Sequence, residues 1–335
     1  MKKYQVTLLF RKLRATGNFS IETSFERMIQ CFPQESEFQL KTFTSSFYSN
    51  GILSRILGIL EAKRHCTDIN HMTGDAHYLA LGLPRKTAIL TVHDCGFMNH
   101  SNPIARLMLK WMWLKLPVGH CRYVTAVSNA TKQDIINYTG CKPEKIVVIP
   151  TIITGDLKKD LKPFNKKCPR ILHIGLAPNK NFNKHVEAIS NLDCELHIIG
   201  KLESHHKDTL DNFGIQWSSE YNISQDEMQR AYAESDIILF ASKLEGFGMP
   251  IIEGQTVGRA VVTSNISSMP EVAGEGACLV DPYDSQSIKE GVQKIIEDEV
   301  YRNSIIEKGF DNVQRYQAHS VALQYEHLYR QILNK

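Results

Sequence analysis

Two glutamates, Glu245 and Glu253, flank the stretch of this chain whose residue types are best suited to hold a ligand. The apolar run 236–242 before them predicts a buried strand, and the loop that follows contains Gly246 and Gly248. Glycine lets a backbone approach a ligand closely, and the proline after this loop suits the first turn of a helix. A helix start offers free N–H groups to an anion, whereas carboxylates suit hydroxyl groups. We therefore expect this stretch to bind a diphosphate together with sugar hydroxyls.

A second loop of similar character follows the apolar run 170–174. Gly175 opens the loop, and Lys180 and Asn181 lie immediately before a helical segment. A lysine at a helix start can meet a phosphate that backbone N–H groups already hold. An exposed lysine without a ligand is the ordinary alternative, but the glutamate motif in the same half of the chain favours phosphate binding.

Histidine and aspartate side chains follow the predicted strands of the first half of the chain. His93 and Asp94 come directly after one apolar run, and His71 and Asp75 lie at the end of another. Ligands of open parallel sheets bind at the carboxyl ends of the strands, where a histidine can donate to a hydroxyl or move a proton. These side chains lack a recognisable zinc-ligand spacing, so we expect hydrogen-bonding roles and no metal. A purely structural role for His93 is the alternative.

The first predicted strand ends in a basic loop that contains Arg11, Arg14 and Gly17. Its cations predict contact with a diphosphate or with an acceptor, although a solvated loop explains the same residues. The loop does not have the spacing G-x-G-x-x-G, and this dinucleotide-binding fingerprint is absent from the whole chain.

Short apolar runs alternate with helix-period segments along most of the chain, an order typical of βα repeats and parallel sheets. They predict an α/β protein with two doubly wound, Rossmann-like domains that face each other across a cleft. We expect an N-terminal domain at 1–150, a linker at 151–169, a C-terminal domain at 170–316, and a helix at 317–335 that is a candidate to pack back on the first domain. The apolar runs are 5–10, 38–43, 68–72, 87–92, 122–127 and 145–149, then 170–174, 194–199, 214–217, 236–241, 259–263 and 277–280.

Composition indicates a globular protein with an uneven charge. Apolar residues make up 42% of the sequence. No window has the roughly 18 uninterrupted apolar residues of a membrane span, and no signal-peptide pattern opens the chain, so we expect a cytoplasmic location. Residues 1–150 carry 19 Lys and Arg against 10 Asp and Glu, whereas the remainder carries 20 against 26. The basic half favours a phosphate-bearing acceptor or an acidic membrane surface over nucleic acid, because no dense cluster of cations and aromatics appears. Solvated charge without a partner is the alternative.

The segment 102–117 alternates large apolar residues, two tryptophans among them, with Arg106, Lys110 and Lys115. Basic amphipathic helices that contain tryptophan bind anionic lipid headgroups. The segment therefore predicts either peripheral contact with the cytoplasmic face of a membrane or a helix half buried against its own sheet.

Together these motifs resemble those of retaining glycosyltransferases of the GT-B fold. This large family uses nucleotide-activated sugars and includes bacterial mannosyltransferases and other polysaccharide-assembling enzymes. The most specific element of the resemblance is the E-x7-E pair, Glu245 and Glu253. It also covers the stretches 91–94, 124–130, 145–150, 175–181 and 268–282.

The resemblance implies a role for each matching residue. Glu253 would hold the nucleotide ribose, Glu245 would contact the transferred sugar, and Lys180 would bind phosphate. His93 would contact the sugar or organise the reacting centre, which makes His93, Glu245 and Lys180 the implied catalytic residues. The implied donor-binding residues are Gly17, Lys180, Asn181, Glu245, Gly246, Phe247, Gly248, Met249 and Glu253, and the acceptor-side residues are Arg11, Arg14, His71, Asp75 and Asp94.

Two positions depart from the family pattern. Leu176 stands where many relatives carry an arginine, and the first loop has the single glycine Gly17 where many have two. The resemblance implies transfer of a sugar from a UDP- or GDP-sugar to a glycan or lipid-linked acceptor, with retention of anomeric configuration, in cell-surface polysaccharide assembly. It implies no cofactor and no metal. A nucleotide-sugar epimerase of the same fold and a nucleotide-sugar-binding protein without turnover are the alternatives.

Overall fold

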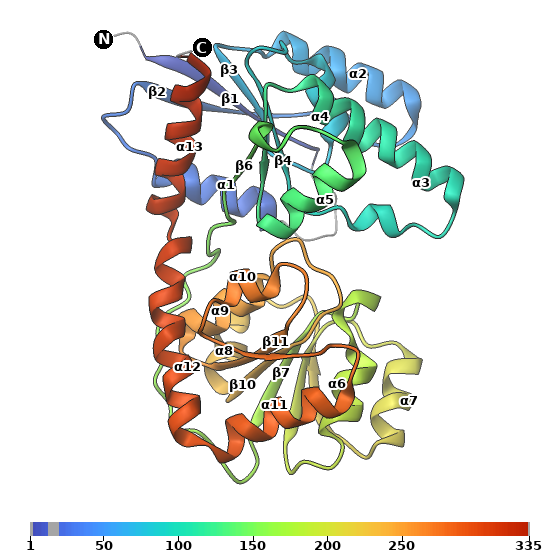
Figure 1. The fold of residues 1–335 in the computed structure, drawn as a ribbon, viewed down its shortest axis with the longest axis vertical. Helices are drawn as coiled ribbons and strands as arrows, with labels where there is room; N and C mark the ends of the chain where they lie inside the picture. The colour runs from blue at the N-terminus through green and yellow to red at the C-terminus, as the bar shows by residue number, and fades with distance from the viewer. Residues whose placement is uncertain (1–2, 13–19, 334–335) are drawn as a thin grey trace. The chain divides into compact units, whose positions relative to one another are not determined.

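The computed structural model describes residues 3–12 and 20–333 (Figure 1). Contacts group the chain into two compact units, one made of Met1–Thr154 with Gln317–Lys335 and the other of Gly155–Tyr316. Each unit is an α/β structure built on one parallel sheet, as the alternating apolar runs predict. Arg14 and Gly17, which we expected in the site, lie outside the described residues.

The first unit contains a six-stranded parallel sheet. Its strands are β1 (Tyr4–Phe10), β2 (Phe38–Thr44), β3 (Ile69–Met72), β4 (Ala88–Val92), β5 (Tyr123–Ala126) and β6 (Ile146–Val148). They lie in the order β2-β1-β3-β4-β5-β6, and every strand end falls within one residue of its predicted run. All residues of β3, β4 and β5 are buried, which explains why these strands read as largely apolar sequence.

The second unit contains another six-stranded parallel sheet. Its strands are β7 (Arg170–Ile174), β8 (Glu195–Ile199), β9 (Gln216–Glu220), β10 (Ile237–Phe240), β11 (Ala260–Ser264) and β12 (Cys278–Val280), in the order β12-β11-β10-β7-β8-β9. Five of them match their predicted runs, but β9 begins two residues later than expected and continues to Glu220. Gly214, with a φ of 63°, forms the turn before β9, and this edge strand is polar and only partly covered, so it produces no clear apolar run.

Helices cover the sheets of both units (Figure 1). In the first unit, α1 and α13 pack together, whereas α2, η1, η3 and α4 form a separate group. The helices of the first unit are α1 (Ser20–Gln30), α2 (Gly51–Arg64), η1 (His77–Gly82), η2 (Gly96–Asn99), α3 (Pro103–Leu109), the π-helix η3 (Lys110–Lys115), α4 (Leu116–His120), α5 (Asn129–Thr139), η4 (Pro143–Lys145) and α13 (Ala318–Leu333). Those of the second unit are η5 (Pro178–Lys180), α6 (Phe182–Ile189), α7 (Ser204–Asn212), α8 (Gln225–Glu234), α9 (Met249–Val257), α10 (Met269–Ala273), α11 (Ser285–Glu297), α12 (Glu299–Asn312) and η6 (Val313–Tyr316). None of the helices formed by the described residues is long and apolar enough to cross a membrane.

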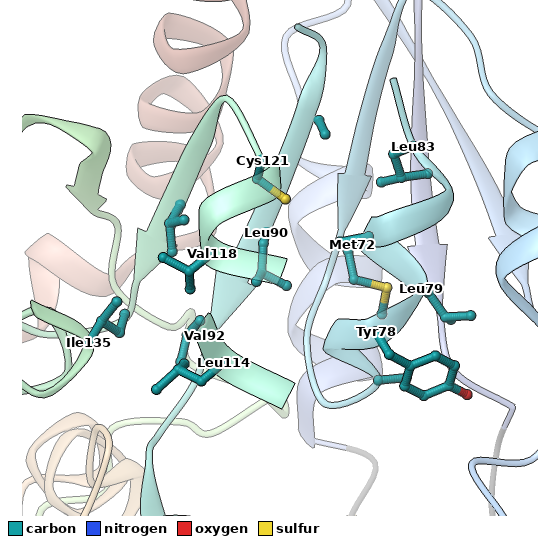
Figure 2. Close-up of a cluster of buried hydrophobic side chains, with 14 of the residues drawn as sticks. Met72, Tyr78, Leu79, Leu83, Leu90, Val92, Leu114, Val118, Cys121 and Ile135 are labelled. Atoms are coloured by element: carbon teal, nitrogen blue, oxygen red, sulfur yellow. The ribbon is translucent and has the colours of Figure 1, made fainter. Parts of the chain in front are cut away.

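A cluster of buried side chains joins the first sheet to η1, η3 and α4 (Figure 2). Met72 and Leu90 from the strands belong to it, with Tyr78 from η1, Leu114 from η3 and Val118 from α4. Burying one aliphatic or aromatic side chain of this size stabilises a fold by about 1.5–3 kcal/mol. The inner sides of η3 and α4 are therefore committed to the core, whereas Trp111, Met112 and Leu116 on their other sides are exposed.

The C-terminal helix α13 contributes to a second cluster in the first unit. Tyr325 and Tyr329 are buried there, and the Tyr329 hydroxyl lies 3.0 Å from Nδ1 of His71. Nε2 of His71 lies 2.7 Å from the hydroxyl of Thr91. Burial lowers the pKa of His71 to about 3, so its imidazole is neutral at pH 7. The expectation that His71 contacts an acceptor is therefore wrong, because this side chain is sealed in the core.

The segment 149–169 contains neither helix nor strand, and the division between the two units falls within it. Ile152 is buried in the core of the first unit. Within the second unit, Arg259 donates to Asp160 at 3.0 Å, and Lys162 lies 3.0 Å from Asp236. The segment 151–169, expected as a linker, is thus anchored to the first unit at its start and to the second unit further along.

Replacing Tyr329 with alanine is expected to destabilise the first unit by about 3–5 kcal/mol, because the change removes a fully buried ring and the hydrogen-bond partner of His71. Leu323→Ala on the same helix is the control, since that side chain is 43% exposed. Urea unfolding followed by circular dichroism measures both variants. Equal unfolding midpoints for the two would contradict the role of α13 in this core.

Candidate functional site

Two serines orient the peptide groups of the loop before α9. Ser268 Oγ donates to the Phe247 carbonyl at 2.7 Å, and Ser267 Oγ donates to the Glu245 carbonyl at 2.8 Å. The N–H and C=O of a trans peptide point in opposite directions, so the N–H groups of these two peptides point away from the serines. The first turn of α9 adds the N–H of Met249, because Pro250 has none and the Ile251 N–H donates to the Gly248 carbonyl at 3.0 Å. The loop therefore presents the N–H groups of Gly248 and Met249, donors of the kind that an anion site requires.

Gly248 makes this loop geometry accessible. Its φ is 111°, a conformation that strains any residue with a side chain, and a Cβ there would lie 3.0 Å from Cδ1 of Ile251. Pro250 occupies the first turn of α9, as the sequence predicts. Glycine and proline together fix where the loop ends and the helix begins.

The two loops that the sequence singled out meet at an ion pair. Lys180 Nζ lies 2.7 Å from Glu245 Oε1, and the two side chains are 22% and 13% exposed. The Asn179 side-chain amide also donates to Glu245 Oε1, at 3.2 Å. Gly175 has a φ of 84°, and a Cβ there would lie 3.3 Å from the Lys180 side chain. A cation and a carboxylate are thus brought together at the start of α9.

Asn181 supports the loop and has no hydrogen left for a ligand. It is buried, its φ is 64°, and its side-chain amide donates to the carbonyls of Ala241 at 3.1 Å and Pro282 at 2.6 Å. These two bonds use both amide hydrogens. We therefore correct the expectation that the Asn181 side chain contacts the donor: it shapes the turn that positions Lys180.

Glu253, one turn into α9, is bonded to a tyrosine that the sequence analysis missed. The Tyr232 hydroxyl donates to Glu253 Oε2 at 2.6 Å, and Tyr232 is fully buried. Burial raises the pKa of Glu253 to about 7, against the opposing effects of the Tyr232 bond and the charge of Lys180. Glu253 Oε1 has no hydrogen-bond partner among the described residues and can accept from a ligand hydroxyl. No local pattern marks Tyr232, which lies 21 residues earlier in α8.

In the first unit, the backbone holds His93 in one tautomer. Nε2 lies 2.8 Å from the Thr73 carbonyl, which can only accept, so Nε2 carries the proton. Nδ1 has no partner in the part of the chain that the structure describes, which leaves it as an acceptor. Burial lowers the pKa of His93, so the ring is neutral at pH 7, although the Thr73 bond opposes this shift. A Cβ at Gly74 would lie 2.5 Å from the ring, so glycine is required beside it. The sequence analysis missed both Thr73 and Gly74.

Arg11 and Asp75, both expected on the acceptor side, pair with each other. Arg11 also pairs with Glu22, at 3.0 Å between Nε and Oε1, so two carboxylates balance its charge.

Asp94 is exposed, and its Oδ1 accepts from the Gly96 N–H at 2.7 Å. Asp94, Asp75 and Glu22 all raise the pKa of His93, which shows that these carboxylates gather around it. Of the first-unit residues expected in the site, the structure thus brings Arg11, Asp75, His93 and Asp94 together and leaves out His71.

A small cavity adjoins His93 within the first unit. Apolar side chains, Phe25, Met28 and Tyr325 among them, form much of its lining, and Ser24 and Thr151 add polar groups. Within residues 3–12 and 20–333, no three His, Cys, Asp or Glu side chains form a group that could hold a metal ion.

Two units, each with one parallel sheet flanked by helices, have the architecture of GT-B glycosyltransferases. The family model described as "Glycosyl transferases group 1" matches residues 156–311, and that described as "Glycosyltransferase Family 4" matches residues 48–154. The chain belongs to these glycosyltransferases, as the motifs of its sequence indicated.

Several curated relatives are mannosyltransferases. O-antigen chain mannosyltransferase B of Escherichia coli is 27% identical over 268 residues, which are 72% of this chain and 69% of that protein. O-antigen chain mannosyltransferase RfbU of Salmonella typhimurium is 25% identical over 240 residues, 68% of this chain and 67% of that protein. Serotype-specific mannosyltransferase WbdA of Escherichia coli is 26% identical over 204 residues, 53% of this chain, but the match spans only 25% of WbdA.

Solved structures share the fold along nearly the whole chain. HepE of Anabaena in complex with UDP and glucose gives a TM-score of 0.77 at 16% identity, over 98% of this chain and 100% of that one. A glycosyltransferase from Rickettsia africae gives 0.74 at 20% identity, over 99% of each chain. At these identities the likeness shows the fold alone.

Glu253→Gln is expected to change how stability depends on pH. The folded-state pKa of Glu253, about 7, lies above the ordinary value of 4.5. The carboxyl therefore contributes stability that is fully present below the unfolded pKa and is lost as the pH rises through 7. Glutamine keeps an acceptor for Tyr232 but cannot ionise, so the wild type should lose about 2 kcal/mol relative to Glu253→Gln between roughly pH 5 and 8.

Urea unfolding of both proteins across this pH range measures the effect, and the comparison cancels the titration of other groups. A difference in unfolding free energy that stays constant with pH would contradict the raised pKa of Glu253.

Proposed function

We propose that the chain transfers a sugar from a UDP- or GDP-sugar to a glycan or lipid-linked acceptor, with retention of anomeric configuration, in the assembly of a cell-surface polysaccharide. The observation that carries this proposal is the Lys180–Glu245 pair at the start of α9, with Glu253 one turn further along. One loop and one helical turn thus combine a cation, backbone donors and two carboxylates, the groups that a sugar diphosphate needs.

On the donor side, Lys180 and the loop N–H groups bind the diphosphate. Glu245 balances Lys180 at 2.7 Å, and a diphosphate competes for the same ammonium group. The exchange frees Glu245 Oε1 to accept from a hydroxyl of the transferred sugar. Glu253 is fixed through Oε2 by Tyr232, so Oε1 is the oxygen that it presents to the ribose.

The reaction places negative charge on the diphosphate as the sugar leaves. Preorganised donors stabilise such charge, and removing one donor from a comparable site costs about 3–4 kcal/mol of transition-state stabilisation. In this proposal the acceptor attacks the face from which the phosphate departs, which retains the configuration, and the phosphate takes the acceptor's proton. His93, neutral and with Nδ1 open, accepts a hydrogen bond from a substrate hydroxyl. The proposed reaction uses neither a protein nucleophile nor a metal.

The names of the relatives support a proposal for the transferred sugar, the polysaccharide product and the nucleotide. The names of the mannosyltransferases favour a mannosyl group as the sugar and an O-antigen-like polysaccharide as the product. The structure of HepE holds UDP and glucose, which favours UDP as one of the two candidate nucleotides of the donor. We propose that the reaction takes place on the cytoplasmic side of a membrane.

The donor nucleotide is expected to raise the melting temperature of the protein. A ligand at about a hundred times its Kd stabilises the folded state by about 2.7 kcal/mol, which corresponds to a shift of about 5–11 °C for a unit of this size. Thermal unfolding with UDP, GDP, UDP-glucose and GDP-mannose identifies the nucleotide. The shift should be largely lost in Glu253→Ala, which removes the proposed ribose contact. A shift that persists in this variant would assign the ribose to other residues, and no shift with any of the four compounds would refute the donor site.

Lys180→Ala is expected to lower kcat for sugar transfer by about 100- to 1000-fold, because it removes the cation that meets the leaving phosphate. Lys184→Ala is the matched control, since Lys184 Nζ pairs with Glu187 at 2.9 Å on α6 and should leave kcat unchanged. Release of UDP or GDP in the presence of mannoside acceptors measures transfer, and unchanged melting temperatures verify folding. Equal kcat in the two variants would remove Lys180 from the reaction. Acceptor-independent conversion of the donor into its epimer would favour an epimerase.

A further inference from the structure

The helix α2 reverses the usual arrangement of a surface helix, in which large apolar residues face the core. Its buried positions are the small residues Gly58 and Ala62. Its exposed positions carry Ile52, Leu53, Ile56, Leu57 and Leu60, of which Ile52 and Leu53 are 72% and 70% exposed. The first unit therefore gains little from these five side chains, whose spacing forms one stripe along the helix.

The helical run α3, η3 and α4 exposes a second apolar set. Its members are Ile104, Leu107, Met108, Trp111, Met112 and Leu116. The inward-facing Leu114 and Val118 of the same run belong to the core (Figure 2), so these six point elsewhere. With the five on α2, they make up eleven of the twenty large hydrophobic side chains that are exposed in the described chain. Scattered apolar residues are ordinary on a surface, but a gathered set marks an interaction site.

These two sets are neighbours. α2 and η3 both pack on η1, and the Arg55 guanidinium of α2 lies 4.8 Å from the ring centre of Trp113 in η3. Figure 1 shows α2, α3 and α4 on the same side of the first sheet. We call the exposed side chains of α2, α3, η3 and α4 the α2–α4 surface.

The α2–α4 surface lies in sequence that is nearly free of acidic residues, since Glu61 of α2 is half-buried and accepts from the Ser46 N–H at 2.9 Å. Residues 38–60 and 95–133 contain no Asp or Glu. The cations of the two helical segments include Arg55, Arg106, Lys110 and Lys115, and Lys115 Nζ lies 4.3 Å from the ring centre of Trp111. Apolar side chains and cations with few carboxylates complement a surface that is apolar beneath and anionic on top.

A hollow of about 330 Å³ opens beside α4. Arg85, Lys115 and His120 line it, together with Leu81 and Leu116. It therefore offers cations to a phosphate group, next to leucines that suit the start of an acyl chain. Leu116 and Lys115 belong to the α4 end of the α2–α4 surface, so the hollow and that surface are continuous.

We propose that the α2–α4 surface docks on an anionic lipid bilayer, with α2 and the α3–α4 run in the headgroup region and a lipid phosphate in the hollow beside Arg85 and Lys115. A second copy of the chain fits less well, because two faces on which cations outnumber carboxylates repel each other. The proposal extends the expectation for 102–117 to α2 and to the hollow. It rests on exposure and charge alone and does not depend on the proposed sugar transfer.

Co-sedimentation with vesicles tests the proposal. The wild-type chain is expected to bind vesicles of phosphatidylcholine with about one-third phosphatidylglycerol at least about tenfold more strongly than vesicles of phosphatidylcholine alone, and to bind less at high salt. The double variant Leu53→Glu with Leu107→Glu should lower binding about tenfold or more, since it places charge in both apolar sets. Val300→Glu is the control, because Val300 is 82% exposed on α12 and should leave binding unchanged. All three positions are exposed, so folding should be preserved, and melting temperatures verify it.

A charge variant tests the hollow separately. Arg85→Gln with Lys115→Gln should reduce the preference for anionic vesicles while keeping the melting-temperature shift with nucleotide. The proposal is overturned if the wild type does not bind anionic vesicles or if the Leu53→Glu, Leu107→Glu variant binds as the wild type does. Analytical ultracentrifugation that finds a dimer, converted to a monomer by this variant, would instead assign the surface to a second copy of the chain.

Discussion

One ion pair, between Lys180 and Glu245, links the two loops from which the candidate donor site is built. Each loop is held by bonds to other loops at the carboxyl ends of the second sheet. Asn181 donates to the carbonyls that follow β10 and β12, and Ser267 and Ser268 hold the carbonyls of the loop before α9. The pair is therefore positioned by groups that stay bonded when Lys180 exchanges its partner. In the proposed reaction, a diphosphate at Lys180 would meet donors whose directions are already set, which would lower the reorganisation that the reaction requires.

Burial shifts the pKa values of His71, His93 and Glu253 toward the neutral form of each group, but these three side chains differ in what remains unbonded. His71 has both ring nitrogens bonded inside the core, so its low pKa is a consequence of packing. His93 has one nitrogen bonded to a backbone carbonyl and one open, so the same loss of charge leaves a fixed acceptor. Glu253 has one oxygen held by Tyr232 and a pKa near neutrality, so a ligand can shift its protonation. The number of unsatisfied acceptors, more than the size of the pKa shift, separates a core residue from a binding group.

Most of the fold could be predicted because parallel strands that are buried on both faces consist largely of apolar residues, and such runs can be recognised in the sequence. The polar edge strand β9 was placed imprecisely, since no apolar run marks it. In the site, glycine, proline and charged residues at strand ends are local signals, and they pointed to Lys180 and the loop before α9. Tyr232 and Gly74 could not be found in this way, because their roles depend on side chains from other segments that pack against them. His71 was misjudged for the same reason: only the structure shows that a tyrosine from the end of the chain covers it.

The proposed reaction must stabilise a leaving diphosphate with few cations. Leu176, at the position where the family pattern has an arginine, packs against the core of the second unit. Arg11 is balanced by Glu22 and Asp75. Lys180 starts from a pair of zero net charge with Glu245, so its attraction for phosphate is partly offset by the carboxylate beside it. The backbone N–H groups have no carboxylate that offsets their attraction for phosphate. Their direction is fixed by the hydrogen bonds to the carbonyl on the opposite side of each peptide. In the proposed reaction, donor activation would therefore depend less on how many cations surround the phosphate than on how firmly the loop before α9 is held.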